Sequence, residues 1–124
     1  RTLFENIIYG FETLYTRQVI DTLLRRLDIP RYPSLDTPVG KHGSELSGGQ
    51  RTIVYLIRAF LRKTPVIVLD EPTASLDAET KLVVKRIVDD LFRDMTIIII
   101  THDLSIKWHE TKHIVVSEGT VSVQ

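Results

Sequence analysis

The chain of 124 residues has no cysteine and no net charge, because 16 Lys and Arg residues balance 16 Asp and Glu residues. Without cysteine, disulfide bonds and thiolate metal sites are excluded. Without a basic excess, no electrostatic argument favours a nucleic-acid partner or an anionic membrane. No uninterrupted aliphatic run is longer than residues 97–100, far short of the roughly 20 residues that cross a bilayer. The chain does not begin with methionine, so we expect it to be cut from something longer.

The first half of the chain has a helical apolar pattern. Apolar residues recur at helical spacing over residues 20–27 and again over residues 53–61, with polar residues on the opposite faces. The segment between them, residues 29–43, contains three prolines and two glycines and is predicted to be a loop. We therefore expect residues 1–62 to form a small helical unit.

The second half has the pattern of an α/β sheet. Residues 66–69 (VIVL) and 97–100 (IIII) are continuous aliphatic runs, which are typical of strands covered on both faces. Between them, an apolar stripe over residues 84–91 predicts a helix, for which Asp77 is a candidate N-cap. Strand, helix and strand in this order form a right-handed crossover in a parallel sheet. Two short β-branched runs end the chain and predict a hairpin that turns at residues 118–119.

Two acidic residues follow the first predicted strand. Asp70 and Glu71 lie where a parallel strand reaches the carboxyl edge of its sheet, which is where open α/β sheets bind ligands. One carboxylate there can hold Mg²⁺, in part through water, and the next can orient or activate an attacking water molecule. The alternative is that the two acids only solvate the strand end and open a turn.

The second aliphatic run ends in a similar way, with Thr101, His102 and Asp103. A histidine at this level, beside a pair of carboxylates, is placed to donate a hydrogen bond to a terminal phosphate. The alternative is a structural histidine that donates to a loop carbonyl.

Residues 47–50 (SGGQ) stand directly before a helical pattern. A serine hydroxyl and free backbone N–H groups at a helix N-terminus form an anion site, to which the helix dipole adds roughly half a positive charge. Two adjacent glycines let a phosphate approach without a Cβ in the way. Taken alone, this pattern is more typical of an ordinary helix start, and its combination with the two polar strand ends favours the phosphate site.

Together, three segments resemble one family. ELSGGQR at 45–51, VIVLDEPTASLD at 66–77 and IIIITHD at 97–103 look like the signature motif, the Walker B motif with its D-loop, and the H-loop of an ATP-binding cassette (ABC) ATPase. Upstream, TLFENIIYG and LDTPVGKHG resemble the segments that precede the signature in exporter-type cassettes. The resemblance covers essentially the whole chain.

This resemblance implies the C-terminal portion of an ABC-type P-loop NTPase fold. Residues 1–62 would be the helical subdomain that carries the signature motif. Residues 63–124 would be part of the RecA-like core, an α/β unit with a parallel sheet that ends in a β-hairpin. The resemblance implies ATP hydrolysis with Mg²⁺ as the metal. Asp70 would be the metal ligand, and Glu71 and His102 would be catalytic. The nucleotide-binding residues would be Ser47, Gly48, Gly49, Gln50 and Asp77.

Two parts of the family's nucleotide site have no counterpart in this sequence. The Walker A pattern G-x-x-x-x-G-K-[ST] does not occur, and the glutamine of the Q-loop is missing before Glu5. Because Walker A supplies most contacts to ATP within one subunit, we expect this polypeptide alone neither to bind ATP tightly nor to hydrolyse it. The missing N-terminal Walker A half would be a further partner. We also expect the isolated polypeptide to dimerise or aggregate, because its aliphatic strands lack part of their cover.

The implied function is that of part of an ABC transporter ATPase domain, which binds and hydrolyses ATP at a head-to-tail dimer interface to drive transmembrane transport. The expected partners are a second nucleotide-binding domain and the transmembrane domains of a transporter, at the cytoplasmic face of a membrane, and no nucleic acid. Two alternatives stay open. One is a catalytically incomplete half-cassette that lends its signature face to a partner ATPase, and the other is a soluble ABC ATPase without a transport role.

Overall fold

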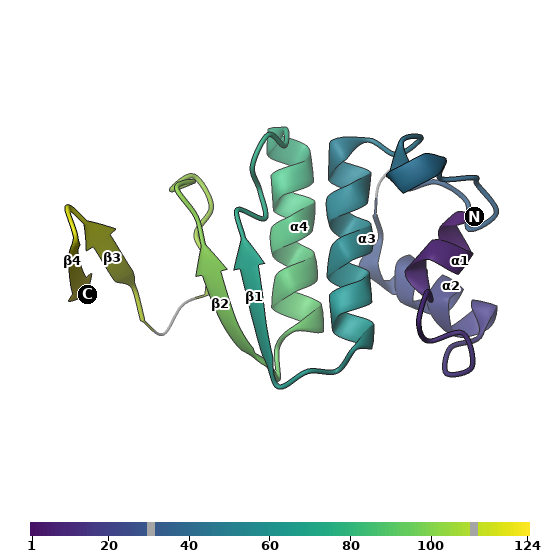
Figure 1. The fold of residues 1–124 in the computed structure, drawn as a ribbon, viewed down its shortest axis with the longest axis horizontal. Coiled ribbons are helices and arrows are strands. Elements are labelled where there is room, and N and C mark those ends of the chain that lie inside the picture. Colours follow the sequence, from purple (N-terminus) through teal and green to yellow (C-terminus); the bar gives the residue numbers. More distant parts are fainter. Residues whose placement is uncertain (30–31, 110–111) are drawn as a thin grey trace.

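The computed structural model describes residues 1–29, 32–109 and 112–124, in which helices lie beside a two-stranded sheet and a hairpin follows (Figure 1). The elements in chain order are α1 (Leu3–Ile7), α2 (Arg17–Leu27), η1 (Lys41–Gly43), α3 (Gly48–Leu61), β1 (Val66–Asp70), α4 (Ala78–Leu91), β2 (Thr96–Ile100), β3 (Ile114–Ser117) and β4 (Thr120–Val123). The predicted α/β fold, with its parallel strand pair and C-terminal hairpin, is confirmed. None of the helices within these ranges is long and apolar enough to cross a membrane.

Each long helix begins at a residue whose side chain satisfies the first helical turn. The N-caps of α2, α3 and α4 are Thr16, Ser47 and Asp77, and each side chain accepts a hydrogen bond from the backbone N–H three residues further on. Asp77 is the N-cap that the sequence predicts. At the other end of α2, Asp28 adopts a left-handed conformation with φ of 46° and terminates the helix after Leu27.

Strands β1 and β2 pair in parallel, and α4 is the crossover between them. The register aligns Val66 with Thr96 and Asp70 with Ile100. Helices α3 and α4 lie side by side and run opposite to the strands (Figure 1). The carboxyl ends of both strands and the N-termini of both helices therefore lie at one end of the molecule.

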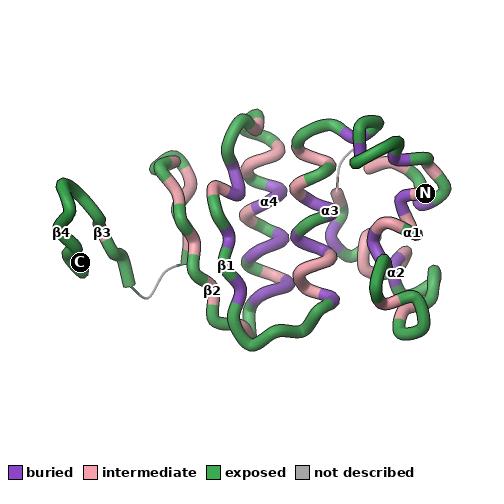
Figure 2. Tube along the Cα trace, in the orientation of Figure 1, coloured by how far each residue is buried: buried purple, intermediate pink, exposed green. Residues whose placement is uncertain are grey.

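One hydrophobic core joins the helices to one face of the sheet. Its largest fully buried side chain is Phe92, which follows α4 and packs edge-to-face on Phe60 of α3 with ring centroids 6.4 Å apart. Ile67 and Leu69 of β1 are buried in the same core. Buried residues lie along α3, α4, β1 and the N-terminal helices (Figure 2).

The opposite face of the sheet is open. Val66 and Val68 of β1, and Ile98 and Ile100 of β2, are each about half exposed. Continuous aliphatic runs are typical of strands covered on both faces, but within the described residues these two strands are covered on one face only. The apolar side chains on this face are therefore accessible to solvent.

The N-terminal helices are tied to the rest of the chain by caps and long-range hydrogen bonds. Helix α1, which the sequence analysis does not predict, begins with a capping box between Thr2 and Glu5. The end of α2 is held by Arg86 of α4, whose guanidinium donates to the backbone carbonyls of Leu27 at 2.9 Å and Asp28 at 2.8 Å. Side chains from both halves of the chain consequently meet in one core.

The C-terminal hairpin turns where the sequence predicts. Glu118 and Gly119 connect β3 to β4, and both have positive φ, 49° and 75°. Two positive values at the central positions are characteristic of a type I′ turn, whose twist matches that of paired strands. All residues of β4 are exposed.

The open sheet face predicts self-association. We expect the isolated 124-residue polypeptide to sediment as a dimer or a larger species, because strands with an exposed apolar face favour contact between copies. Replacing Val68 and Ile98 together by threonine removes apolar area and keeps β-propensity. This double variant should shift the sedimentation-velocity distribution towards monomer.

A matched control leaves the sheet unchanged. Tyr55 of α3 and Leu82 of α4 are each 62 % exposed, and replacing both by glutamine, a good helix former, should not alter sedimentation. A clean monomer of the unsubstituted chain, with a single cooperative unfolding transition, contradicts the prediction.

Candidate functional site

The carboxyl edge of the strand pair places Asp70 and Glu71 beside the segment that follows β2. Strand β1 ends at Asp70, and Glu71 follows with φ of 47°, in the left-handed region that non-glycine residues seldom adopt. The backbone N–H of Glu71 donates to the carbonyl of Ile100 at 2.8 Å, which continues the strand pairing by one bond. This bond holds Glu71 beside the segment that carries His102.

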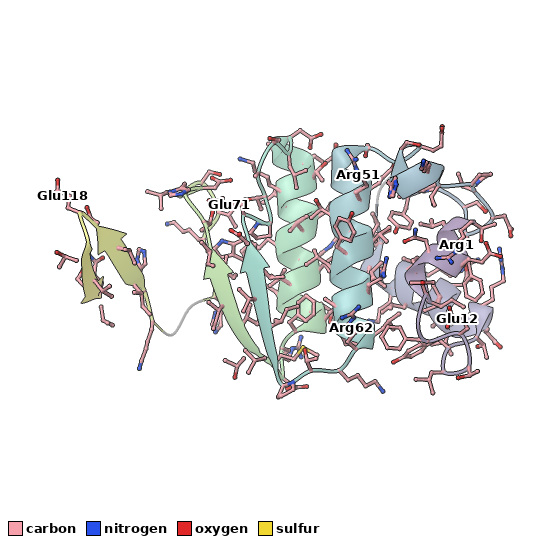
Figure 3. All side chains as sticks on the ribbon, viewed as in Figure 1. Arg1, Glu12, Arg51, Arg62, Glu71 and Glu118 are labelled. Carbon is pink, nitrogen blue, oxygen red and sulfur yellow. The ribbon has the colours of Figure 1, made fainter. Side chains whose placement is uncertain are left out.

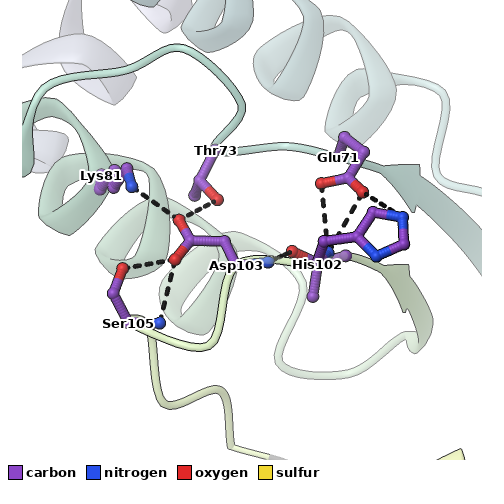
Figure 4. A network of polar contacts seen from close by, with 7 residues as sticks. Glu71, Thr73, Lys81, His102, Asp103 and Ser105 are labelled. Carbon is purple, nitrogen blue, oxygen red and sulfur yellow. Dashed lines mark hydrogen bonds and ion pairs between the residues drawn. The ribbon is translucent and has the colours of Figure 1, made fainter. Parts of the chain in front are cut away.

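Glu71 and His102 are in direct contact (Figure 4). The backbone N–H of His102 donates to Oε1 of Glu71 at 3.2 Å, and Nε2 of His102 lies 3.5 Å from the same oxygen. The His102 side chain is 97 % exposed, whereas that of Glu71 is 32 % exposed. The carboxylate is thus held against the sheet edge, while the imidazole stands in the open and is accessible to a ligand.

The open edge that carries Asp70 and Glu71 is suited to a hydrated Mg²⁺ ion, and not to an ion enclosed by protein ligands alone. Both are carboxylates at an open edge, and hard cations prefer oxygen ligands. Within the part of the chain that the structure describes, no three His, Asp or Glu side chains gather closely enough to hold a metal ion by themselves. Mg²⁺ usually keeps several waters and is held by one or two carboxylates together with substrate phosphates, and the exposed Asp70 at the end of β1 fits that mode.

Beside His102 lies a polar network that the sequence analysis does not predict (Figure 4). Oδ2 of Asp103 forms an ion pair with Nζ of Lys81 at 2.8 Å and accepts a hydrogen bond from the hydroxyl of Thr73, a buried residue, at 3.1 Å. Oδ1 accepts from the backbone N–H of Ser105 at 2.9 Å and from its hydroxyl. Lys81, followed by the two Ser105 donors, holds the pKa of Asp103 well below its usual range. No local pattern signals this network, because its members lie on separate segments.

The side chains of Ser47 and Gln50 cap the start of α3, where two backbone donors find no acceptor among the described residues. Ser47 Oγ accepts from the N–H of Gln50 at 3.2 Å, and Gln50 Oε1 accepts from the N–H of Ser47 at 2.9 Å, which forms a capping box. Among the described residues, none accepts a hydrogen bond from the backbone N–H of Gly48 or Gly49. Free N–H groups at a helix N-terminus are suited to an anion.

The two glycines of this turn have different surroundings. A Cβ on Gly48 would meet no atom within 4 Å, whereas a Cβ on Gly49 would lie 2.6 Å from Cγ2 of Thr80. Gly49 is therefore needed where the start of α3 packs on the first turn of α4, and Gly48 faces open space. The sequence analysis predicts room for phosphate at both positions and does not predict the packing role of Gly49.

A cavity of about 200 Å³ lies between the starts of α3 and α4. Its lining includes Ser47, Gly49 and Gln50 from the first helix and Asp77 and Thr80 from the second. The backbone N–H of Thr80 donates to the Asp77 carboxylate at 2.7 Å and, as the largest cause, lowers the pKa of Asp77. Four of the predicted nucleotide-binding residues thus surround one hollow.

The predicted residues form two groups at one end of the molecule. Figure 3 shows Arg51, near the start of α3, and Glu71 at this end, with Arg62 at the opposite end of α3. No hydrogen bond or ion pair between described residues joins one group to the other. We name them the strand-edge group, which consists of Asp70, Glu71 and His102, and the helix-start group, which consists of Ser47, Gly48, Gly49, Gln50 and Asp77.

A sequence model described as that of the ABC transporter family matches residues 1–74. The chain is 37 % identical to the ATP-dependent lipid A-core flippase of Vibrio cholerae, over 97 % of this chain and 22 % of the relative. It is 41 % identical to a multidrug resistance ABC transporter ATP-binding and permease protein of Lactococcus lactis, over 84 % of this chain and 18 % of the relative.

The fold of the chain is similar to that of a solved ABC exporter. A bacterial Atm1-family ABC exporter, solved with ATP bound, superposes with a TM-score of 0.75 and 29 % identity, over 95 % of this chain and 21 % of the exporter chain. The chain spans about a fifth of the length of these relatives. Since the family's sequence model covers more than half of the chain and exporter relatives cover nearly all of it, the chain belongs to the ABC transporter family.

Proposed function

We propose that this chain is part of an ABC transporter ATPase domain that binds and hydrolyses ATP at a head-to-tail dimer interface and so drives transmembrane transport. The observation that carries the proposal is the position of the strand-edge group and the helix-start group, at one end of the molecule but without contact with each other. Two separate half-sites on one chain are what a nucleotide shared between two copies requires. Each copy would offer its strand-edge group to one nucleotide and its helix-start group to the other.

The strand-edge group supplies the hydrolytic chemistry in this proposal. Glu71, held by its bond to Ile100, orients a water molecule for in-line attack on the terminal phosphate of ATP and accepts a proton from it. His102 donates a hydrogen bond from its open imidazole to an oxygen of that phosphate and stabilises the charge that develops there. Asp70 would hold Mg²⁺, which when bound neutralises phosphate charge.

The helix-start group supplies an anion site for the partner's nucleotide. The free N–H groups of Gly48 and Gly49 donate hydrogen bonds to phosphate oxygens, and the positive end of the α3 dipole attracts their charge. The capping box of Ser47 and Gln50 keeps the helix end intact, so these donors keep their direction. Asp77, which caps the neighbouring α4, lies at the same interface.

The transport part of the proposal rests on the relatives. One is named a lipid A-core flippase and another an ATP-binding and permease protein. By this likeness, the partners are a second nucleotide-binding domain and transmembrane domains, and the chain works at the cytoplasmic face of a membrane. A further segment would supply the Walker A half of the nucleotide site.

A second candidate is a half-cassette that offers its helix-start group to a partner ATPase and hydrolyses no ATP of its own. The observation in its favour is that the helix-start group lines its own cavity and, among the described residues, forms no hydrogen bond with the strand-edge group. The two candidates differ in the role of Glu71, because only the first needs that carboxylate for turnover.

Glu71→Gln in the full-length protein should lower kcat for ATP hydrolysis about 10²- to 10³-fold, because an amide does not accept a proton from water. Phosphate release at saturating ATP measures the effect. The control is Glu118→Gln in the hairpin turn, the same chemical change far from the strand edge, and it should leave turnover unchanged (Figure 3). Equal turnover of Glu71→Gln and wild type removes Glu71 from its assigned role and favours the half-cassette.

Two substitutions at Ser47 separate phosphate binding from helix capping. Asp and Asn cap helices as well as Ser does, so both variants should keep the fold. Ser47→Asp adds a negative charge beside the anion site and should lower kcat/KM for ATP about tenfold or more, which corresponds to a repulsion of about 1.4 kcal/mol. Ser47→Asn should stay near wild type. If both variants hydrolyse ATP equally well, no phosphate binds at the start of α3.

A further inference from the structure

The network around Asp103 has no part in the chemistry proposed above, yet it is better buried than the histidine it adjoins. The side chains of Asp103 and Lys81 are 19 % and 25 % exposed, against 97 % for His102. Packing does not position a fully exposed side chain. The place of His102 therefore depends on its backbone and on its contact with Glu71.

Both carboxylate oxygens of Asp103 are in use, and they face different partners (Figure 4). Through Oδ1, Asp103 accepts from the N–H of Ser105 and closes the turn that follows His102. Through Oδ2, it meets Lys81 of α4 and Thr73 of the segment between β1 and α4. One oxygen thus shapes the loop, and the other ties it to two separate parts of the chain.

Lys81 lies in the first turn of α4, which also packs against the helix-start group. It comes directly after Thr80, whose Cγ2 occupies the space that a Cβ on Gly49 would need. The first turn of α4 accordingly abuts the start of α3 and also holds the loop of His102.

We propose that Lys81 and Asp103 are positioning residues for ATP hydrolysis: their ion pair fixes His102 relative to the first turn of α4 and so links the helix-start group to the strand-edge group. This inference rests on the proposed function. The donors around Asp103 keep its carboxylate charged, so the pair persists at neutral pH. Neither side chain has to touch nucleotide for this role.

The test is a double-mutant cycle in the full-length protein, with kcat and KM for ATP measured separately. Lys81→Met removes the charge, Asp103→Asn keeps the hydrogen-bond acceptor for Ser105, and Lys81→Arg keeps the charge. The matched control is Lys85→Met, because Lys85 pairs with Asp89 one turn further along α4 and does not contact the loop of His102. Thermal unfolding midpoints are recorded for every variant.

Lys81→Met should lower kcat about 10- to 100-fold, since a displacement of about 1 Å of a reacting group has effects of this size. KM for ATP should change little, because the positioning role requires no contact between either side chain and the nucleotide. Asp103→Asn should have a similar effect, and the double variant should be no worse than the poorer single variant, as expected for two residues acting through one contact. Lys81→Arg should retain most of the turnover, and Lys85→Met should match wild type.

Either of two results overturns the positioning role. The first is that Lys81→Met has the same kcat as Lys85→Met. The second is that the kcat losses of Lys81→Met and Asp103→Asn multiply in the double variant. If Lys81→Met fails to fold, the kcat of Asp103→Asn is compared with that of Lys81→Arg and of wild type instead. Glu71→Gln runs in the same assay. Full turnover of that variant overturns the proposed ATPase function itself, which distinguishes the two failures.

Discussion

The parallel register of β1 with β2 governs where the candidate groups lie. Because α4 returns the chain to the end of the sheet where β1 begins, β2 runs in the same direction as β1 and Asp70 pairs with Ile100. The residues that follow the two strands therefore leave the sheet at one level. The bond from Glu71 to Ile100 continues that register beyond the strand and sets the carboxylate beside His102. A slip of one residue would turn every side chain of a strand to the other face. It would also separate Glu71 from His102.

The crossover helix organises the rest of the site from its first turn. Asp77 caps α4, Thr80 fills the space left by Gly49, and Lys81 reaches Asp103. Two groups that do not touch each other are thereby placed by the same few residues. In the proposed function, these groups face different nucleotides, and the contacts of the first turn of α4 connect them.

Features governed by neighbouring residues are predictable from this sequence. The aliphatic strands, the N-cap at Asp77 and the hairpin turn at 118–119 follow from short patterns, and the structure confirms them. Helix α1 is missed because its five residues are too few for a periodic pattern, and its stability depends on a capping box and on burial against distant segments. The contacts of Asp103 are missed because Thr73 and Lys81 lie on other segments, distant from it in the chain, and are brought to it by the tertiary fold.

Read alone, the sequence specifies the order of the elements, their caps and the chemical character of the candidate groups, because these follow from periodicity and side-chain chemistry over short stretches. Packing specifies which groups meet. It leaves one face of the sheet open, presses Gly49 against Thr80, and gives the loop of His102 its anchor on α4. These contacts join segments that are distant in the chain, and their separation in space is set by strand register and helix packing, which no short stretch of sequence encodes.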